Sequence, residues 1–314
     1  MKSSAAVALT GTSSAWRVHL KLLGMAALWG ASWPAGRVLA QALPPMTAAS
    51  WRFGMALVML AAWLHWRGGL GRLGALSARQ WLGLAVAGTF GVFGYALFFM
   101  LGLAHVPAGR AALVVTTNPV VTTLLAAWWF GERLNRRIAA GMAIATAGAL
   151  VVIAHGRPWT LLAGGIGLGE LLLLGCVATW VGYTLIGKRL LTGIDPLTTT
   201  AVTAGIGLVL LLSSALLFEG PQALAAPMHA MASVWVAMAF LAAGATVLAY
   251  AWYFEGVSAL GAGAASAYIT LVPIFGVLFA ALLLGERIDT QMALGGCLAV
   301  GGLGVMNLAR RPSA

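Results

Sequence analysis

The sequence predicts an all-α integral membrane protein in which ten transmembrane helices form two inverted five-helix repeats. Three observations support this fold class. Of the 314 residues, 61% are hydrophobic and only 8% are charged, whereas a soluble domain carries about 25% charged residues. Apolar runs long enough to cross a bilayer recur along the whole chain, and one pattern occurs twice, half a chain length apart. A chain so poor in charge could not cover its own surface in water, so its medium must be lipid.

The apolar runs define the spans, because a helix needs roughly 20 mostly apolar residues to cross the hydrocarbon core. Short turns containing Pro, Gly, Arg or Asp separate them, and no loop is long enough to hold a soluble domain. We divide the chain into an N-terminal repeat, residues 1–155, and a C-terminal repeat, residues 156–314. The ten spans are predicted at residues 20–39, 46–65, 80–103, 109–130, 135–153, 166–187, 197–217, 232–255, 264–285 and 290–308.

The cations predict the orientation of these spans, because lysine and arginine accumulate in cytoplasmic loops. With the N-terminus inside, 13 of the 18 lysines and arginines fall in cytoplasmic segments, four fall outside, and Arg52 alone lies within a span. We therefore expect a bacterial-type inner membrane protein with both termini in the cytoplasm. The net charge of +11 is spread over short loops rather than along one stripe, which argues against a nucleic-acid partner.

The doubled pattern is NPVVTTLLAAWWFGER at residues 118–133 and VPIFGVLFAALLLGER at residues 272–287. Pro119 corresponds to Pro273 at an offset of 154 residues, and the correspondence continues upstream at an offset of 151. Helices 1–5 thus resemble helices 6–10. Because five is odd, the second copy must cross the membrane in the opposite direction. Inverted repeats recur in secondary transporters, whose substrate site lies near the midplane between the halves.

The predicted helices, the five-plus-five repeat and the twice-used proline and Gly-Glu-Arg pattern resemble the drug/metabolite transporter superfamily, EamA type, over residues 18–308. Within that superfamily, the aromatic-rich helices are most similar to the YddG-type exporters of aromatic amino acids. The resemblance implies a secondary transporter, not an enzyme, that exports amino acids and related small metabolites by alternating access. It implies a small-molecule substrate and the lipid bilayer as partners, with no cofactor, and it leaves the oligomeric state open.

Pro119 and Pro273 fall near the middle of predicted helices 4 and 9, where a proline removes a backbone hydrogen bond and kinks the helix. Their repetition at one register favours a hinge role in a paired motion, although a fixed kink that aids packing explains them equally well. Thr117 and Asn118, just before Pro119, add polar groups at mid-membrane depth, where such groups face protein or water. We predict that Thr117 or Asn118 touches a substrate cavity.

Aromatic residues are expected to line this cavity from helices 1, 3, 6 and 8. On helix 3 they share one face, because they recur at helical spacing, and the repeat pairs Phe98 with Trp252 and Phe99 with Tyr253. An aromatic pocket suits an amphiphilic organic substrate, whereas the alternative is a stripe that packs or faces lipid. The candidate substrate-binding residues on these helices are Trp29, Ser32, Trp33, Tyr95, Phe98, Phe99, Trp180, Tyr183, Trp252 and Tyr253.

Arg52 is the one cation inside a span, and an intramembrane charge marks a functional site by default. It could attract a substrate carboxylate, or it could snorkel to the outer surface or bond a loop carbonyl. Glu170, Glu255 and the five histidines lie near span ends or in loops, so the sequence shows no proton-coupling residue. It also shows no catalytic residues and no cluster of metal ligands.

Three other functions compete with amino-acid export. A nucleotide-sugar or sugar-phosphate carrier of the same superfamily would need more cations around the cavity to balance phosphate. A membrane-embedded enzyme would need a catalytic or metal constellation at one membrane face. A channel would leave the inverted copies unexplained. The two Gly-Glu-Arg turns are expected to act locally, with Glu132 and Glu286 near the start of the next helix.

Overall fold

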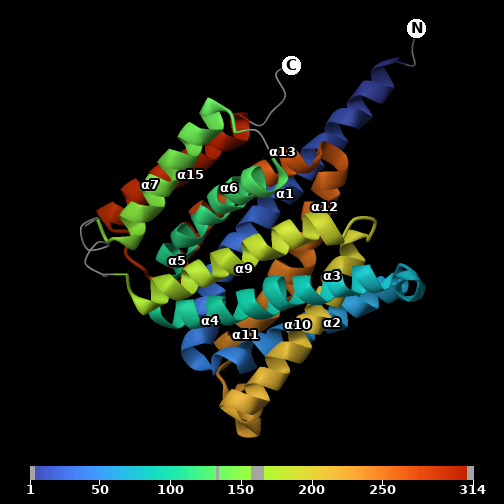
Figure 1. Ribbon diagram of the computed structural model, residues 1–314, viewed down its shortest axis with the longest axis vertical. Coiled ribbons are helices and arrows are strands. Elements are labelled where there is room, and N and C mark those ends of the chain that lie inside the picture. Colours follow the sequence, from blue (N-terminus) through green and yellow to red (C-terminus); the bar gives the residue numbers. More distant parts are fainter. Residues whose placement is uncertain (1–3, 132–133, 157–165, 310–314) are drawn as a thin grey trace.

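The computed structural model describes residues 4–131, 134–156 and 166–309, and over these residues the chain is helical, with turns and no strand (Figure 1). The first half contains α1 Ser4–Ala42, α2 Pro45–Trp66, η1 Leu70–Ala75, α3 Ala78–Gly88, η2 Thr89–Gly94, α4 Tyr95–His105, α5 Ala108–Val114, η3 Val115–Thr117, α6 Asn118–Phe130 and α7 Arg136–Ile153. The second half contains α9 Leu168–Leu190, α10 Pro196–Ser214, η4 Ala215–Glu219, η5 Pro221–His229, α11 Ala232–Ala239, η6 Phe240–Leu248, α12 Ala249–Leu260, α13 Ala262–Ala267, η7 Tyr268–Leu271, α14 Val272–Leu284 and α15 Thr290–Ala309.

Nine helical segments of the described chain are long and apolar enough to cross a membrane. The tenth predicted span, residues 20–39, lies inside α1, which falls outside this group. Trp, Ser and Pro residues and Arg37 lower its mean hydropathy. Nevertheless α1 runs through the middle of the bundle (Figure 1) and packs against α4, α12 and α14. The structure thus supplies nine apolar spans and one central, less apolar helix, and the crossing by α1 stays a prediction.

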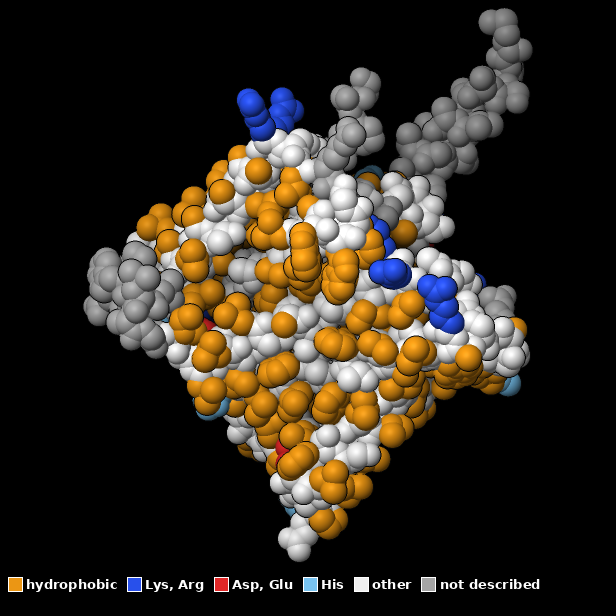
Figure 2. All heavy atoms as spheres, viewed as in Figure 1, with side chains coloured by type: hydrophobic (Ala, Val, Ile, Leu, Met, Phe, Trp, Pro, Cys, Tyr) orange, Lys and Arg blue, Asp and Glu red, His pale blue; other side chains and the backbone are white. Residues whose placement is uncertain are grey.

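The outer surface of the bundle is apolar, as expected for a protein that lipid surrounds. Hydrophobic side chains are spread over the face shown in Figure 2. Large side chains such as Trp128 and Leu282 remain 79% and 69% exposed. In water such a surface would be a liability, whereas in a bilayer it is the contact with the acyl chains. These observations support the membrane embedding that the composition predicts.

The same irregular segments interrupt the helices of both halves. The π-helical segment η2 has its counterpart in η6, and the 3₁₀ turns η3 and η7 come directly before Asn118 and Val272. Pro119 and Pro273 are therefore second residues of α6 and α14, where a missing N–H costs little. The helices are irregular at both prolines, as predicted. Each proline, however, lies in the first turn of a new helix that follows a 3₁₀ turn, and does not kink a continuous helix.

Packing contacts also repeat between the halves. Leu22 of α1 fills the space above Gly256 of α12, where a Cβ on the glycine would lie 2.4 Å from the leucine Cδ2. Leu173 of α9 does the same above Gly102 of α4, at 2.7 Å. The leucines are offset by 151 residues and the glycines by 154, which are the offsets found in the sequence. Each half thus presents a leucine to a glycine of the other half, as a two-fold pseudosymmetric assembly requires.

A close pair of helices, α7 and α15, lies to one side of the bundle (Figure 1). Its contact surface is made of glycines, which let the two backbones approach closely. A Cβ on Gly148 would lie 2.3 Å from the amide nitrogen of Ala299, and a Cβ on Gly302 would lie 2.3 Å from that of Ala145. Because the obstructing atoms belong to the backbone, neither position can accept a side chain unless the helices move apart.

At one end of the bundle, hydrogen bonds and ion pairs join the two halves. Glu286, after α14, accepts hydrogen bonds from the backbone N–H groups of Ala108 and Gly109 at the start of α5, at 2.7 and 2.9 Å. The expectation of a local role for this glutamate is therefore wrong. Its partners lie in the other half, because the free N–H groups and positive dipole end of α5 attract a carboxylate. Glu132, its counterpart, lies outside the described residues.

Further charged contacts gather at this end, which we call the Glu286 end. Arg37 of α1 donates to the carbonyl oxygens of Leu103 and Val106 where α4 ends. Arg110 of α5 pairs with Asp289 at 3.0 Å and also contacts His155. Arg37 thereby joins α1 to the end of α4, and Arg110 joins α5 to the loop that precedes α15.

The opposite end lacks the equivalent contacts. At the Glu286 end α4 packs on α1 and α5 packs on α14, whereas α12 with α9 and α13 with α6 form no comparable contact within the described residues. Lys188, the counterpart of Arg37, lies 4.8 Å from the ring centre of Phe130. Two helix pairs are therefore packed at the Glu286 end whose counterparts are not packed at the other end, where Lys21 of α1 nevertheless pairs with Glu255 of α12 at 2.6 Å. This asymmetry distinguishes two halves that otherwise use the same contacts.

The helix pair predicts opposite effects for adjacent glycines. Gly302→Ala should lower the free energy of unfolding by about 1–3 kcal/mol, the usual cost of overpacking. Gly301→Ala is the matched control, because a Cβ at that position meets nothing within 4 Å. It should leave stability unchanged or raise it by up to about 1 kcal/mol through helix propensity. Thermal unfolding of the detergent-solubilised chain measures both, and equal midpoints would contradict the close approach of α7 and α15.

The Glu286 contact predicts that Glu286→Gln lowers the unfolding midpoint, because a neutral amide loses the attraction of the carboxylate to the α5 terminus. The expected cost is about 1–2 kcal/mol. Arg287→Gln is the control, since this neighbouring side chain is exposed. If the two variants unfold alike, the hydrogen bonds to Ala108 and Gly109 do not stabilise the Glu286 end.

Candidate functional site

Eight aromatic residues from four helices meet in the interior of the bundle, and we call them the aromatic cluster. Two come from each of α1, α4, α9 and α12, so each half of the chain contributes four. Two of the eight rings are buried and the others are half-buried. The members are Trp29, Trp33, Tyr95, Phe99, Trp180, Tyr183, Tyr250 and Tyr253.

One part of the cluster joins α1, α4 and α9. The rings of Trp33 and Phe99 have centres 5.1 Å apart, and Phe99 stacks on Tyr95 at 6.0 Å. Tyr95 in turn contacts Trp180 at 5.5 Å, and Trp180 contacts Tyr183 at 5.6 Å. These separations lie in the favourable range for aromatic pairs. The contacts run without a gap from the first half of the chain into the second.

The other part joins α1 to α12. Trp29 lies 5.3 Å from Tyr250 and 5.6 Å from Tyr253, measured between ring centres. Its indole N–H donates to the carbonyl oxygen of Ala245 at 3.0 Å, within the π-helical segment η6. Trp29 and Trp180, which correspond in the repeat, therefore each contact aromatic rings of the opposite half. Trp29 of α1 thus contacts the aromatic residues of α12, and Trp180 of α9 contacts Tyr95 of α4.

Phe98 and Trp252 do not belong to this cluster. A Cβ on Gly175 would lie 2.6 Å from the ring of Phe98, and a Cβ on Gly24 would lie 2.6 Å from the ring of Trp252. Each ring therefore fills the space over a glycine of the neighbouring helix, and the two contacts are copies of one another. Both rings are thus directed toward glycines of the neighbouring helix, and a place for Phe98 and Trp252 in the cavity wall stays a prediction.

The three polar candidates are arranged differently from one another. Ser32 donates its hydroxyl to the carbonyl of Trp29 at 2.6 Å, and Thr117 donates to that of Val114 at 2.9 Å. Both hydroxyls are thus occupied within their own helices. The Oδ1 atom of Asn118 is buried with no hydrogen-bond partner among the described residues. Of the three, Asn118 alone keeps an unused polar atom, at the break between η3 and α6.

Arg52 of α2 adds a positive charge to the aromatic cluster. Its guanidinium carbon lies 4.8 Å from the ring centre of Phe53 and 5.9 Å from that of Phe99. Its Nε atom is buried and has no hydrogen-bond partner in the described part of the chain. Two aromatic rings therefore lie beside the cation, and its buried Nε–H has no acceptor among the described residues.

Sequence reasoning left Tyr250 and Arg52 outside the predicted binding set. Tyr250 lies three residues before Tyr253, so helical spacing could have identified it. Arg52 was recognised as the one charge within a span, yet its nearness to Phe99 depends on the packing of α2 against α4. The described residues contain no group of three or more His, Cys, Asp and Glu side chains that could hold a metal.

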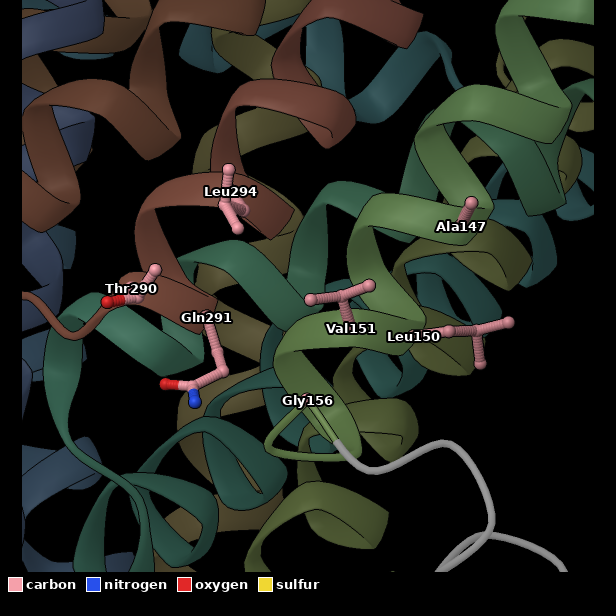
Figure 3. A pocket seen from close by; sticks show the side chains of 7 residues that line it. All are labelled: Ala147, Leu150, Val151, Gly156, Thr290, Gln291 and Leu294. Atoms are coloured by element: carbon pink, nitrogen blue, oxygen red, sulfur yellow. The ribbon is translucent and has the colours of Figure 1, made fainter.

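A groove of about 470 Å³ lies between α7 and α15, away from the aromatic cluster. Figure 3 shows Val151 of α7 and Gln291 of α15 on its two sides. The other lining residues are aliphatic, Gly or Thr290, and none of them is titratable. Such a groove beside two helices on the edge of the bundle fits an acyl chain. It offers none of the aromatic or charged groups that would recognise a polar solute.

Comparisons with known proteins agree with this architecture. The model of the EamA-like transporter family matches residues 16–154 and again residues 167–308. A Bacillus subtilis transporter, YyaM, is 28% identical over 92% of each chain. The "Probable terminal-alkyne amino-acid exporter" of Streptantibioticus cattleyicolor is 30% identical over 74% of this chain and 75% of its own. The "Probable amino-acid metabolite efflux pump" of Escherichia coli K12 is 28% identical over 71% and 74%.

A solved crystal structure shares the fold, with a TM-score of 0.62 and 23% identity over 95% of this chain and 99% of that one. Two consecutive family matches cover most of the chain and coincide with the two sets of repeated helices. On these grounds the chain belongs to the EamA-like transporter family.

Proposed function

We propose that this protein is a secondary transporter that exports amino acids with aromatic or other apolar side chains, and related small metabolites, by alternating access. The observation that carries the proposal is the aromatic cluster, which both repeats build around Arg52. Rings supply apolar contact and stacking for a side chain, and a cation supplies a partner for a carboxylate. An amino acid with an apolar side chain offers both groups to this site.

The relatives support this class of cargo. Two of them carry names that refer to amino-acid export or to efflux of amino-acid metabolites. Both matches extend over more than two thirds of this chain. Because the chain is only about 30% identical to them, these names support the class of solute rather than a single compound.

The asymmetry between the two ends supports alternating access. With both termini in the cytoplasm, the Glu286 end faces outward, so in the described conformation the outer end is packed together and the inner end lacks the matching helix contacts. Repeated halves can exchange their conformations. Export then requires the contacts of Glu286 and Arg37 to break while the opposite helix ends approach one another. Pro119 and Pro273, at the 3₁₀ breaks, are the proposed hinges of this movement, and α1 is the proposed tenth span.

The rival functions find less support. A nucleotide-sugar carrier needs several cations for its phosphates, and Arg52 is the one cation found at the aromatic cluster among the described residues. A membrane-embedded enzyme needs a nucleophile, acid–base pair or metal ligands. The buried polar groups at the cluster are arginine, tyrosine and tryptophan, which suit binding.

Transport into proteoliposomes tests the proposal. The purified chain should transport phenylalanine or other apolar amino acids, and the measurement with and without a pH gradient will identify proton coupling. Transport of a nucleotide sugar in the absence of any amino-acid transport would overturn the assignment.

Truncation of a ring in the cluster should change the preference among cargoes. Trp180→Ala removes a stacking partner and its apolar area, which together contribute about 2–3 kcal/mol to binding. Phenylalanine transport should therefore fall roughly 30- to 150-fold relative to alanine transport. Trp129→Ala is the matched control, because this tryptophan is 62% exposed on the outer surface. Equal phenylalanine-to-alanine ratios in both variants, corrected for protein level, would show that Trp180 only packs.

The cation bias predicts that the C-terminus is cytoplasmic. A reporter that is active only in the cytoplasm, fused after residue 314, should give signal, whereas a reporter active only outside should be silent. The reverse pattern would contradict the count of ten spans and the assignment of the Glu286 end to the outer side.

A further inference from the structure

Arg52 is a cation in the membrane interior with no anionic partner in the described part of the chain. It lies seven residues after the start of α2, which corresponds to a depth of roughly 10 Å along the helix. A buried ion without a partner is costly, because desolvation is not repaid. Such a charge either binds an anion during transport or has an acidic side chain of the protein as its structural partner.

The carboxylates that could serve as structural partners are all engaged elsewhere. Each of the six described acidic residues has a partner of its own, and all but Glu255 lie at or next to a helix end. Glu170 pairs with His155, Asp195 caps α10, Glu219 caps α2 at Met46 and Thr47, Glu255 pairs with Lys21, Glu286 caps α5, and Asp289 pairs with Arg110. None of these contacts includes Arg52, so its counter-ion is not part of the described chain.

The direction of the side chain argues against snorkelling. A snorkelling arginine extends its guanidinium to the interface and keeps it in water. The guanidinium of Arg52 instead lies within 5.9 Å of the ring centre of Phe99, which is only 2% exposed. Its Nε atom is buried. The side chain is thus directed into the bundle, toward the aromatic cluster.

The repeat argues against a need of the scaffold for this cation. At the offset of 151 residues, Arg52 corresponds to Thr203 of α10. Thr203 is buried, and its hydroxyl bonds the carbonyl of Thr199 in its own helix at 2.7 Å. The pseudosymmetric position in α10 is therefore filled by a small side chain whose hydroxyl is hydrogen-bonded within its own helix. A requirement of helix packing would apply to both halves, whereas this charge occurs in one.

We propose that Arg52 is the residue that recognises the cargo's carboxylate, and that the site selects for this group rather than for an ammonium group. The inference rests on the proposed function and narrows its substrate class. An incoming carboxylate would satisfy the N–H donors of the guanidinium in a bidentate pair, while the rings of the cluster hold the apolar side chain. No described carboxylate is free to hold the ammonium group of an amino acid. The cargo class is therefore small aromatic or apolar carboxylates, which includes amino acids and their deaminated analogues.

The test compares three ligands that share the phenethyl skeleton on the detergent-solubilised full chain: phenylalanine, 3-phenylpropionate, which lacks the ammonium group, and phenethylamine, which lacks the carboxylate. Binding is measured by the quenching of intrinsic tryptophan fluorescence and by the ligand-induced shift of the unfolding midpoint. The wild-type chain should bind both carboxylates more tightly than the amine. Arg52→Gln should weaken both carboxylates roughly 10- to 150-fold, the loss expected for hydrogen bonds to a charged group. Its affinity for phenethylamine should not change.

Two control variants separate recognition from structure. Arg52→Lys keeps the charge but not the planar pair of donors, so carboxylate affinity should fall by an intermediate factor. Arg287→Gln makes the same chemical change at an exposed arginine and should leave all three affinities as they are. Without ligand, Arg52→Gln should unfold no earlier than the wild type, because it removes an unpaired buried charge.

Three results would overturn the inference. If Arg52→Gln retains the wild-type ratio of carboxylate to amine affinity, Arg52 does not recognise the carboxylate. If the unliganded variant unfolds earlier and that ratio is unchanged, Arg52 has a structural partner. If the wild-type chain binds none of the three ligands while it transports another solute in proteoliposomes, the proposed amino-acid cargo fails and the inference fails with it.

Discussion

The hydrocarbon of the bilayer supplies no hydrogen bonds, and this constraint determines most of the structure. Every backbone N–H and C=O at membrane depth must find a partner within the protein. The spans are accordingly helical, and their irregular segments remain 3₁₀ or π turns that keep backbone hydrogen bonds. The 3₁₀ turns before Asn118 and Val272 pack against neighbouring helices. Most described acidic side chains lie at helix ends, where free N–H groups donate to them as caps, as Glu286, Glu219 and Asp289 show.

The same constraint explains how the two halves are joined. Lipid provides no hydrophobic force between apolar helices, so close packing and polar contacts must hold them together. Glycines supply the close packing, as Gly102 and Gly256 show with the leucines of the opposite half. Polar contacts join the halves at the Glu286 end, where one carboxylate satisfies two orphan N–H groups of a distant helix.

The features that bear on the proposed function are those in which the two repeats differ. Trp29 and Trp180 occupy corresponding positions and each contacts a tyrosine of the opposite half, Tyr253 and Tyr95, although these two tyrosines do not correspond in the repeat. Arg52 has no cationic counterpart, since the equivalent position is Thr203. The closed Glu286 end likewise has no equivalent at the opposite end in the described residues. The symmetric contacts thus form the scaffold, whereas the asymmetric ones distinguish the two ends and give the site its charge.

The sequence by itself determined the membrane class, the two repeats, the breaks at Pro119 and Pro273, and most of the aromatic residues that meet. These properties follow from composition, period and internal correspondence, which are local or depend only on sequence spacing. Only the tertiary structure decided that Phe98 and Trp252 pack on glycines and that Glu286 binds the start of α5. It also placed Arg52 beside Phe99. Helical spacing identifies the side of a helix on which a residue lies, but the neighbour on that side depends on how closely the helices approach one another.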